Sequence, residues 1–269
     1  MTMFSGGTLF GYALLGICEI LLPALLLSPL QRRQQVNWTA VVVGAVIYAL
    51  TVRLNDISVG MLFRGAPYAN RVLIAAETIC IWEECGRWFT ARFAMPQADR
   101  TRDAVSYGIG HGGAECFRNA MIAFGRLKNG MIFNSEGIAG LTDGHSDAAR
   151  ERISFQLTEA AKHTFGISLC DLLCCAAALA FHIALSMLIF RAVRENRVKT
   201  LLPCAIFLHD LMNASGWLAS FGNSILLRDF AGIAAAAVII VIAMKLIDGK
   251  ALFAVWLEEM ECSFADRLR

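Results

Sequence analysis

Residues 72–95 read VLIAAETICIWEECGRWFTARFAM, a mainly apolar run that is long enough to cross a lipid bilayer as one helix. Near its middle the run contains Glu83, Glu84 and Arg87. Each charge at that depth costs roughly 2.5–3.5 kcal/mol on insertion scales, so a chain that keeps charges there usually uses them. This stretch therefore predicts a membrane span and places the functional centre of the protein on the same helix.

The composition of the whole chain is that of a membrane protein. Of its 269 residues, 57% are hydrophobic and only 17% are charged. The net charge of +2 is too small to indicate nucleic-acid binding, so we expect no nucleic-acid partner. Nine cysteines fall mostly inside apolar runs without a CxxC pair, which is typical of small buried side chains. We expect a single integral membrane domain over residues 1–269.

Apolar runs of bilayer length predict an all-α fold, a polytopic transmembrane helix bundle of about seven spans. The predicted spans are residues 8–29, 38–62, 71–95, 104–125, 167–190, 201–221 and 229–248. No Lys or Arg precedes the first span, so we expect a retained helix and not a cleaved signal peptide. Residues 251–260 are apolar enough to form a surface helix or an eighth span.

Basic residues in the short segments between spans predict the orientation of the chain in the membrane. Most of them follow the first, third and fifth spans: Arg32, Arg33, Arg92, Arg100, Arg102, Arg191, Arg194, Arg197 and Lys199. The short segments on the other side contain Arg64, Arg71 and Arg228. Because basic segments stay in the cytoplasm, we expect an external N-terminus and an internal C-terminus in a prokaryotic cytoplasmic membrane.

Only one connection between spans is long, and it covers about residues 126–166. It begins with a Gly- and Asn-rich stretch, and Ser146 with Asp147 forms a candidate helix N-cap. Residues 148–165 then place apolar side chains at helical spacing. This pattern predicts an amphipathic helix at the membrane surface, either a connector or a gate over an active site.

Three later spans each contain a histidine that is followed, four residues later, by a polar residue on the same helix face. The pairs are His111 with Glu115, His182 with Ser186, and His209 with Asn213. One such pair alone could simply hold two helices together. Leaving the charged groups of residues 72–95 unpaired, however, would cost on the order of 10 kcal/mol, comparable with the stability of a whole protein. We therefore predict that these side chains converge on one polar cavity within the membrane.

Gly108, Gly110, Gly112 and Gly113 surround His111. Small residues in a membrane helix typically form a face for close helix packing. A phosphate-binding loop is a poor alternative, because the stretch lacks the flanking strand of a nucleotide-binding fold.

In combination, these motifs resemble the YhfC family of membrane peptidases, over roughly residues 70–215. The resemblance is carried by Glu-Glu-x-x-Arg at 83–87, by YGIGHGGAE at 107–115, by HIALS at 182–186 and by His-x-x-x-Asn at 209–213. The family lies in a superfamily of glutamate-dependent intramembrane proteases with the type II CAAX prenyl endopeptidases, the Abi proteins and PrsW. The resemblance implies a CAAX-protease-like helix bundle and the following site residues: Glu83, Glu84, Arg87, His111, Glu115, His182, His209 and Asn213.

One departure concerns the substrate. The prenyl endopeptidases place three residues between the glutamate pair and the arginine, whereas this chain has two. Prenylated CAAX substrates are therefore not expected. The superfamily also resembles the scaffold subunit of gamma-secretase, which is without proteolytic activity of its own, so a non-catalytic scaffold stays an alternative.

The chemistry that these residues suggest is peptide hydrolysis inside the bilayer, on a membrane-associated substrate. Glu84 or Glu83 would take a proton from a water molecule, which would attack the scissile carbonyl. Arg87 would keep the second carboxylate ionised. His209 and Asn213 would donate hydrogen bonds to the developing oxyanion. His182 would position the water or protonate the leaving amine.

Two other interpretations stay open. His111, His182, His209 and Glu115 could instead bind zinc with one open position, and that would also make a hydrolase. Because no His-Glu-x-x-His motif is present, the version without a metal or other cofactor is preferred. Buried carboxylates and histidines also form proton relays in transporters, although no inverted repeat supports a proton-coupled transporter here.

Overall fold

A computed structural model describes residues 3–33, 35–66, 68–98, 100–220 and 225–247. Within these residues the protein is entirely helical, so the all-α prediction is confirmed. The helices, in chain order, are α1 (Gly6–Arg32), α2 (Trp38–Leu62), α3 (Tyr68–Phe89), the π-helix η1 (Thr90–Ala94), α4 (Thr101–Glu136), α5 (Ala139–Thr142), α6 (Asp147–Ala161), α7 (Phe165–Arg194), α8 (Val198–Ser220) and α9 (Ile225–Leu246). The predicted surface helix or eighth span at 251–260 lies outside the described residues.

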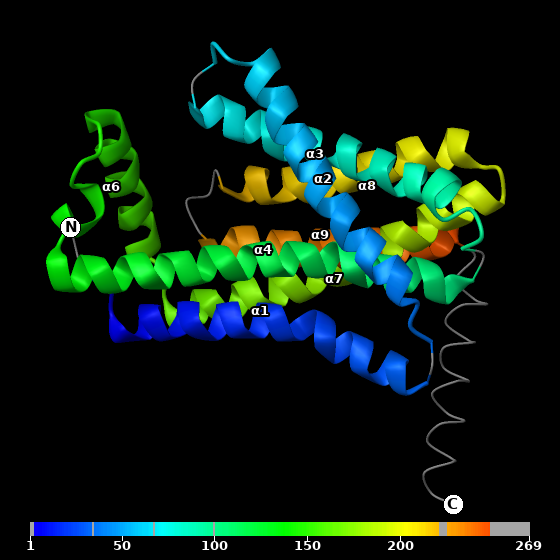
Figure 1. The fold of residues 1–269 in the computed structure, drawn as a ribbon, viewed down its shortest axis with the longest axis horizontal. Helices are drawn as coiled ribbons and strands as arrows, with labels where there is room; N and C mark the ends of the chain where they lie inside the picture. Colours follow the sequence, from blue (N-terminus) through cyan, green and yellow to red (C-terminus); the bar gives the residue numbers. More distant parts are fainter. Residues whose placement is uncertain (1–2, 34, 67, 99, 221–224, 248–269) are drawn as a thin grey trace, which may run out of the picture.

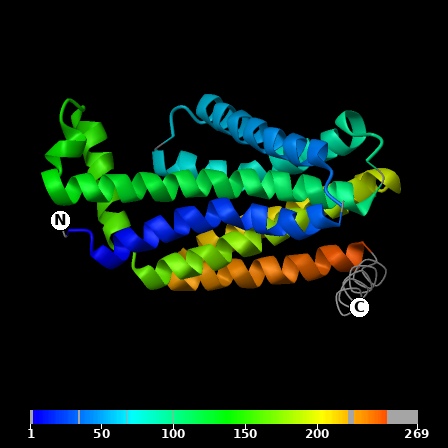
Figure 2. The ribbon, with the colours of Figure 1, turned by 60° about the horizontal axis from the view of Figure 1, so that its bottom comes forward.

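The long helices α1, α2, α3, α4, α7, α8 and α9 form an elongated bundle and alternate in direction along it (Figures 1 and 2). Four of them, α1, α2, α7 and α9, are both long enough and apolar enough to cross a membrane. The other three, α3, α4 and α8, reach the same length but contain the polar residues of the predicted site. The alternating directions agree with the predicted order of seven spans.

Several predicted spans begin where a polar side chain caps the helix. The side chains of Ser5, Asn37 and Thr164 each accept a hydrogen bond from the backbone N–H three residues later, at the starts of α1, α2 and α7. Such caps satisfy backbone donors that have no partner inside the helix. The observed α2 has the bounds predicted from the sequence, residues 38–62.

Helix α4 lies at the centre of the bundle and packs against α1, α2 and α7. Its glycines allow the neighbouring backbones to come very close. A Cβ atom at Gly110 would lie 2.0 Å from the carbonyl oxygen of Val41 on α2, and one at Gly108 would lie 2.6 Å from Cα of Ile183 on α7. The glycines around His111 therefore form a close-packing face, as the sequence predicted.

The long connection begins later than the sequence predicted. Residues 126–136 continue α4 and do not form a loop, so the helix reaches Glu136 and ends at Gly137, which has a φ of 70°. The added turns are held by Asn134, whose side chain donates to the carbonyl of Phe4 at 2.8 Å and accepts from its N–H at 2.9 Å. At about 54 Å, the 36-residue helix is longer than the roughly 30 Å hydrocarbon core, so it must extend beyond it.

The amphipathic helix predicted in the connection is α6, which begins after the N-cap residue Ser146. Leu157 and Ala160 are buried against Tyr12 and Phe133 at the far end of α1 and α4. Figure 1 shows α6 standing across that end of the bundle at a steep angle to the long helices. Because Phe133 follows His111 by 22 residues, or about 33 Å of helix, this placement favours a surface connector over a gate above the predicted site.

The basic turns after α1, η1 and α7 lie at one end of the bundle (Figure 1). At the other end, the connection adds basic residues that the count of short segments omitted: Arg126, Lys128, Arg150, Arg152 and Lys162. Together with Arg64, Arg71 and Arg228, they nearly balance the basic residues of the first end. The orientation of the chain in the membrane therefore stays a prediction.

Candidate active site

Helix α3 holds Glu83, Glu84 and Arg87 on one buried face. The side chain of Arg87 is fully buried, and its two terminal nitrogens contact both carboxylates. Nη1 donates to Glu84 Oε1, and Nη2 lies 3.6 Å from Glu83 Oε2. These are the contacts expected for residues three and four positions apart on a helix. One guanidinium thus faces two buried carboxylates, and one of the negative charges needs further partners.

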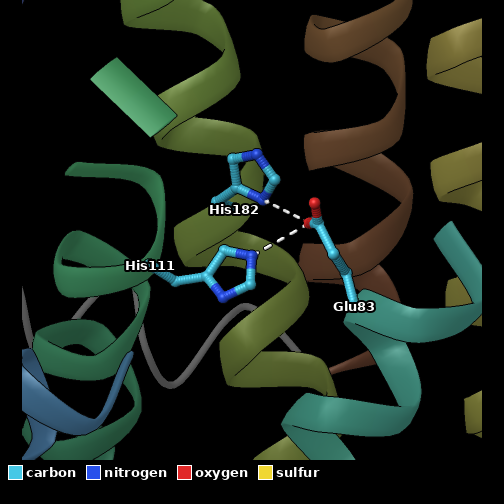
Figure 3. Close-up of side chains that lie close together, drawn as sticks. All are labelled: Glu83, His111 and His182. Carbon is cyan, nitrogen blue, oxygen red and sulfur yellow. Dashed lines mark hydrogen bonds and ion pairs between the residues drawn. The ribbon is translucent and has the colours of Figure 1, made fainter. Parts of the chain in front are cut away.

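Three histidines from three other helices surround the carboxylate of Glu83. The nitrogen nearest to Glu83 Oε2 is His111 Nε2 on α4, at 2.9 Å. His182 Nδ1 on α7 and His209 Nε2 on α8 each lie 3.9 Å from the same oxygen. Figure 3 shows His111 and His182 pointing toward the carboxylate of Glu83 from neighbouring helices. The structure therefore brings together the histidines that the sequence predicted to converge.

Two of these histidines have a second carboxylate on their other ring nitrogen. His182 Nε2 lies 2.6 Å from Glu115 Oε2, and His209 Nδ1 lies 2.8 Å from Glu84 Oε1. Arg87 Nη2 is 2.5 Å from His182 Nδ1, and a guanidinium can only donate. His182 Nδ1 is therefore the acceptor, and its Nε2–H donates to Glu115. An ionised carboxylate can only accept, so His209 Nδ1–H donates to Glu84 Oε1.

Three polar atoms of the cluster have no hydrogen-bond partner among the described residues. They are His111 Nδ1, Glu84 Oε2 and Arg87 Nε, and all three are buried. A buried polar atom without a partner is costly and often marks a position for water, an ion or a substrate group. Glu84 Oε2 is the most informative of the three, because the other oxygen of this carboxylate is already held by Arg87 and His209.

Aromatic rings pack against the cluster, and no sequence pattern marks them because aromatic residues are common in apolar spans. Tyr48 meets His111 edge-on, with ring centroids 5.2 Å apart, and Tyr107 stacks beside it at 5.9 Å. On the other side Phe181 meets His209 edge-on at 5.1 Å. These rings keep water away from the polar groups, which strengthens the electrostatic interactions among them.

In the described part of the chain, none of the polar side chains that follow a histidine by four residues bonds to the ring of that histidine. Glu115 bonds to His182 on α7 and not to His111 on its own helix. Ser186 donates to the backbone carbonyl of His182 at 2.7 Å. Asn213 lies outside the cluster, where its amide donates to the carbonyl of Ala76 at 2.9 Å and joins α8 to an earlier part of α3. Asn213 is thus placed as a link between helices.

The cluster can be tested for its fit to a metal ion. Ligand atoms of Glu83, His111 and His182 all lie within 4.8 Å of one another, and all three side chains are buried. Four ligands around zinc stand about 3.3 Å apart, so small shifts would bring these atoms into place. The carboxylates behind His182 and His209 match the outer partners that orient metal-binding histidines. The donor set therefore fits a divalent ion such as zinc.

The carboxylate in this donor set is not the one that the sequence suggested for a zinc site. Glu83, and not Glu115, faces the shared centre, because Glu115 lies behind His182. Arg87 Nη2 lies on the lone pair of His182 Nδ1, so this histidine could bind a metal only after the guanidinium moves aside. His111 and His209 have no such obstacle in the described part of the chain.

Comparison with known proteins supports the resemblance seen in the sequence. A family model described as "YhfC intramembrane metalloprotease" matches residues 18–240. The uncharacterized membrane protein YhfC of Bacillus subtilis (strain 168) is 30% identical over 148 residues, which cover 53% of this chain and 54% of that protein. The chain thus spans about half the length of this curated relative. No solved structure matches.

The word metalloprotease in the family description bears on the mechanism. It favours a metal-dependent site over the metal-free version that the sequence analysis preferred, without naming the metal. It gives no support to a purely glutamate-dependent peptidase. The wider likeness to the CAAX prenyl endopeptidases is not addressed by these matches and stays a prediction.

Proposed function

The chain belongs to the YhfC intramembrane metalloprotease family, and on this basis we propose that it is an endopeptidase that cleaves a membrane-associated peptide within the bilayer. The observation that carries the proposal is the cluster around Glu83, whose carboxylate oxygen lies between 2.9 and 3.9 Å from ring nitrogens of His111, His182 and His209. Histidine and glutamate side chains clustered in this way are the groups that hydrolytic sites use to activate water.

Glu83, His111 and His182 would hold the metal, His182 once Arg87 has moved aside, and His209 would be a further donor. A bound zinc ion supplies a nucleophile at neutral pH and polarises the scissile carbonyl. Glu115 and Glu84 would keep His182 and His209 in the required orientation, since each accepts a hydrogen bond from the far side of the ring.

Glu84 is the residue best placed to move protons. Its Oε1 is fixed by Arg87 and His209, while its buried Oε2 has no partner in the described part of the chain. That oxygen can accept a proton from the attacking water and later pass it to the leaving amine. Arg87 holds the carboxylate in place, because the guanidinium stays positively charged at any physiological pH.

The test compares membranes from cells that express the wild-type protein or its Glu84→Gln variant, by mass spectrometry of new peptide ends in membrane proteins. We expect substrates cleaved by the wild type to be cleaved roughly 10²–10⁴-fold more slowly by the variant, the usual range for a lost general base. Glu151→Gln on the exposed face of α6 is the matched control and should cleave normally. Full cleavage by a Glu83→Gln, Glu84→Gln double variant would contradict the proposal.

Metal dependence needs its own measurement on purified protein. We expect about one zinc per chain by elemental analysis, less in a His111→Ala, His209→Ala variant, and loss of cleavage on chelation that added zinc restores. Cleavage that survives thorough chelation would favour Glu83 as a metal-free base, which the hydrogen bond from His111 would support. A protein that cleaves nothing in either state would instead be a scaffold or a transporter.

A further inference from the structure

A second feature of the bundle lies on the far side of His111 from the cluster. Helices α1 and α2 both pack against α4 but diverge from each other along it (Figure 1). Between the three helices lies a cavity of about 700 Å³. Its walls are mainly aliphatic and aromatic side chains, among them Ile20, Pro23, Leu27, Val52, Ile109 and Phe117. A volume of this size is typical of ligand-binding sites in proteins.

One side chain contacts both this cavity and the candidate active site. Tyr48 lines the cavity, and the edge of its ring meets the imidazole of His111. Gly110 and Gly113, which flank His111 on α4, form part of the same wall. A molecule that fills the cavity would therefore contact Tyr48, whose ring touches the histidine nearest to Glu83.

The cavity also contains two arginines, Arg53 on α2 and Arg118 on α4. Arg53 has no hydrogen-bond or ion-pair partner among the described residues, and the partner given by the structure for Arg118 is the hydroxyl of Tyr48, at 3.4 Å. Asp56, one turn beyond Arg53, forms no ion pair with either of them within the described chain. Neither guanidinium forms a close ion pair in the described chain, although the carboxylates of Glu115 and Asp56 act on Arg118 from nearby. Two guanidiniums in an otherwise apolar wall would favour an anionic group, and a carboxylate suits their planar fork best.

We propose that this cavity binds the apolar segment of the peptide substrate, and that Arg53 and Arg118 bind a carboxylate of that peptide close to the scissile bond. The inference rests on the proposed peptidase function and adds the class of substrate. The depth of the arginines favours a peptide over a phospholipid. Arg53 is only three residues, about 5 Å, beyond the middle of α2, whereas lipid phosphates lie outside the roughly 30 Å hydrocarbon core.

The test measures binding and does not require turnover. The Glu84→Gln protein in nanodiscs is mixed with a 20-residue Leu/Ala peptide that carries a photoreactive residue and a free C-terminal carboxylate. We expect photo-crosslinks on the cavity walls of α1, α2 and α4. Binding should weaken about tenfold or more when Arg53 and Arg118 are both changed to Gln, in line with the loss of hydrogen bonds to a charged group. Arg152→Gln on exposed α6 is the control and should bind normally.

Two further peptides, compared with the one that has a free C-terminus, identify the source of the carboxylate. An amidated peptide should bind about tenfold or more weakly, and an amidated peptide with one internal Glu should recover binding if side-chain carboxylates are accepted. An Ala49→Phe variant, which fills the cavity and leaves both arginines, should block crosslinking even if the arginine variant folds poorly. Equal binding of charged and amidated peptides, or displacement of the peptide by phosphatidylglycerol alone, would overturn the inference.

Failure of this inference and failure of the peptidase proposal give different results. Carboxylate-dependent crosslinking in the cavity, without cleavage by the wild type, would leave the binding site standing and remove the peptidase. Cleavage that does not depend on Arg53 or Arg118, with crosslinks elsewhere on the protein, would support the peptidase and remove the proposed binding site.

Discussion

His182 and Glu115 form a hydrogen bond of 2.6 Å that joins α7 to α4 behind the candidate active site. Because Arg87 donates to the opposite nitrogen of the same ring, the imidazole is fixed at both ends. A ring held in this way keeps one tautomer and one orientation, which a hydrolytic site requires of its histidines. The pair therefore acts on the chemistry through His182.

Replacing Glu115 by Gln tests this positioning role. Gln can still accept from His182 Nε2–H, so the variant should fold, but the neutral amide makes the imidazole a weaker base. We expect zinc affinity to fall by about 10- to 100-fold, as is usual for outer partners of metal-binding histidines. Competition with a zinc-binding dye measures this directly, and Glu151→Gln is the matched control. An unchanged affinity would mean that Glu115 only links α4 to α7.

Arg87→Ala tests the charge balance of the cluster. Without the guanidinium, Glu83 and Glu84 become two buried carboxylates that share only histidines as partners. We expect the free energy of unfolding to fall by about 3–5 kcal/mol, the usual cost of removing one partner from a buried ion pair. Unfolding of the purified protein in mild detergent would show this, with Arg152→Ala as the exposed control. A loss below 1 kcal/mol would indicate that water already reaches the carboxylates.

Gly110→Ala tests the close approach of α2 to α4. The new methyl group would lie 2.0 Å from a backbone oxygen of Val41, so the two helices must separate. We expect a loss of about 1–3 kcal/mol in stability, together with lower activity, because His111 follows directly. Gly125→Ala on the same helix has open space around it and should gain about 0.5–1 kcal/mol. Equal stability changes in the two variants would contradict the packing described above.

Reporter fusions test the orientation in the membrane. We expect a reporter after Arg269 to read as cytoplasmic and a reporter before Met1 to read as external, since the basic turns after α1, η1 and α7 favour the cytoplasmic side. The basic residues of the 126–166 connection oppose this order. If they dominate, both reporters will change sides together, while the order of the helices stays the same.

Much of this arrangement could be predicted from the sequence, because the cost of burying charge in a membrane leaves few alternatives. A Glu-Glu-x-x-Arg helix and three histidines in apolar spans must find one another or remain unpaired, and the structure brings them together. The bounds of α2 followed from a mainly apolar run after the capping residue Asn37.

The pairing within the cluster could not be predicted in the same way. Spacing along one helix placed Glu115 on the same face as His111 but did not identify its partner, which is His182, because the glycines of α4 bring α7 close enough for contacts between helices. The same limit applies to Asn213, whose amide meets a backbone carbonyl of α3. The late end of α4 was missed because Gly- and Asn-rich sequence usually forms loops, and here tertiary contacts with Phe4 stabilise the helix.

The division of the cluster along the chain has a consequence for how the protein is made. Glu83, Arg87 and His111 belong to helices that leave the ribosome first, while His182 and His209 arrive with α7 and α8. Until those two helices enter the bilayer, the early half holds carboxylates that lack most of their partners. Assembly of the centre is therefore a late step of membrane insertion, and chains that stop before residue 165 should be unstable and degraded.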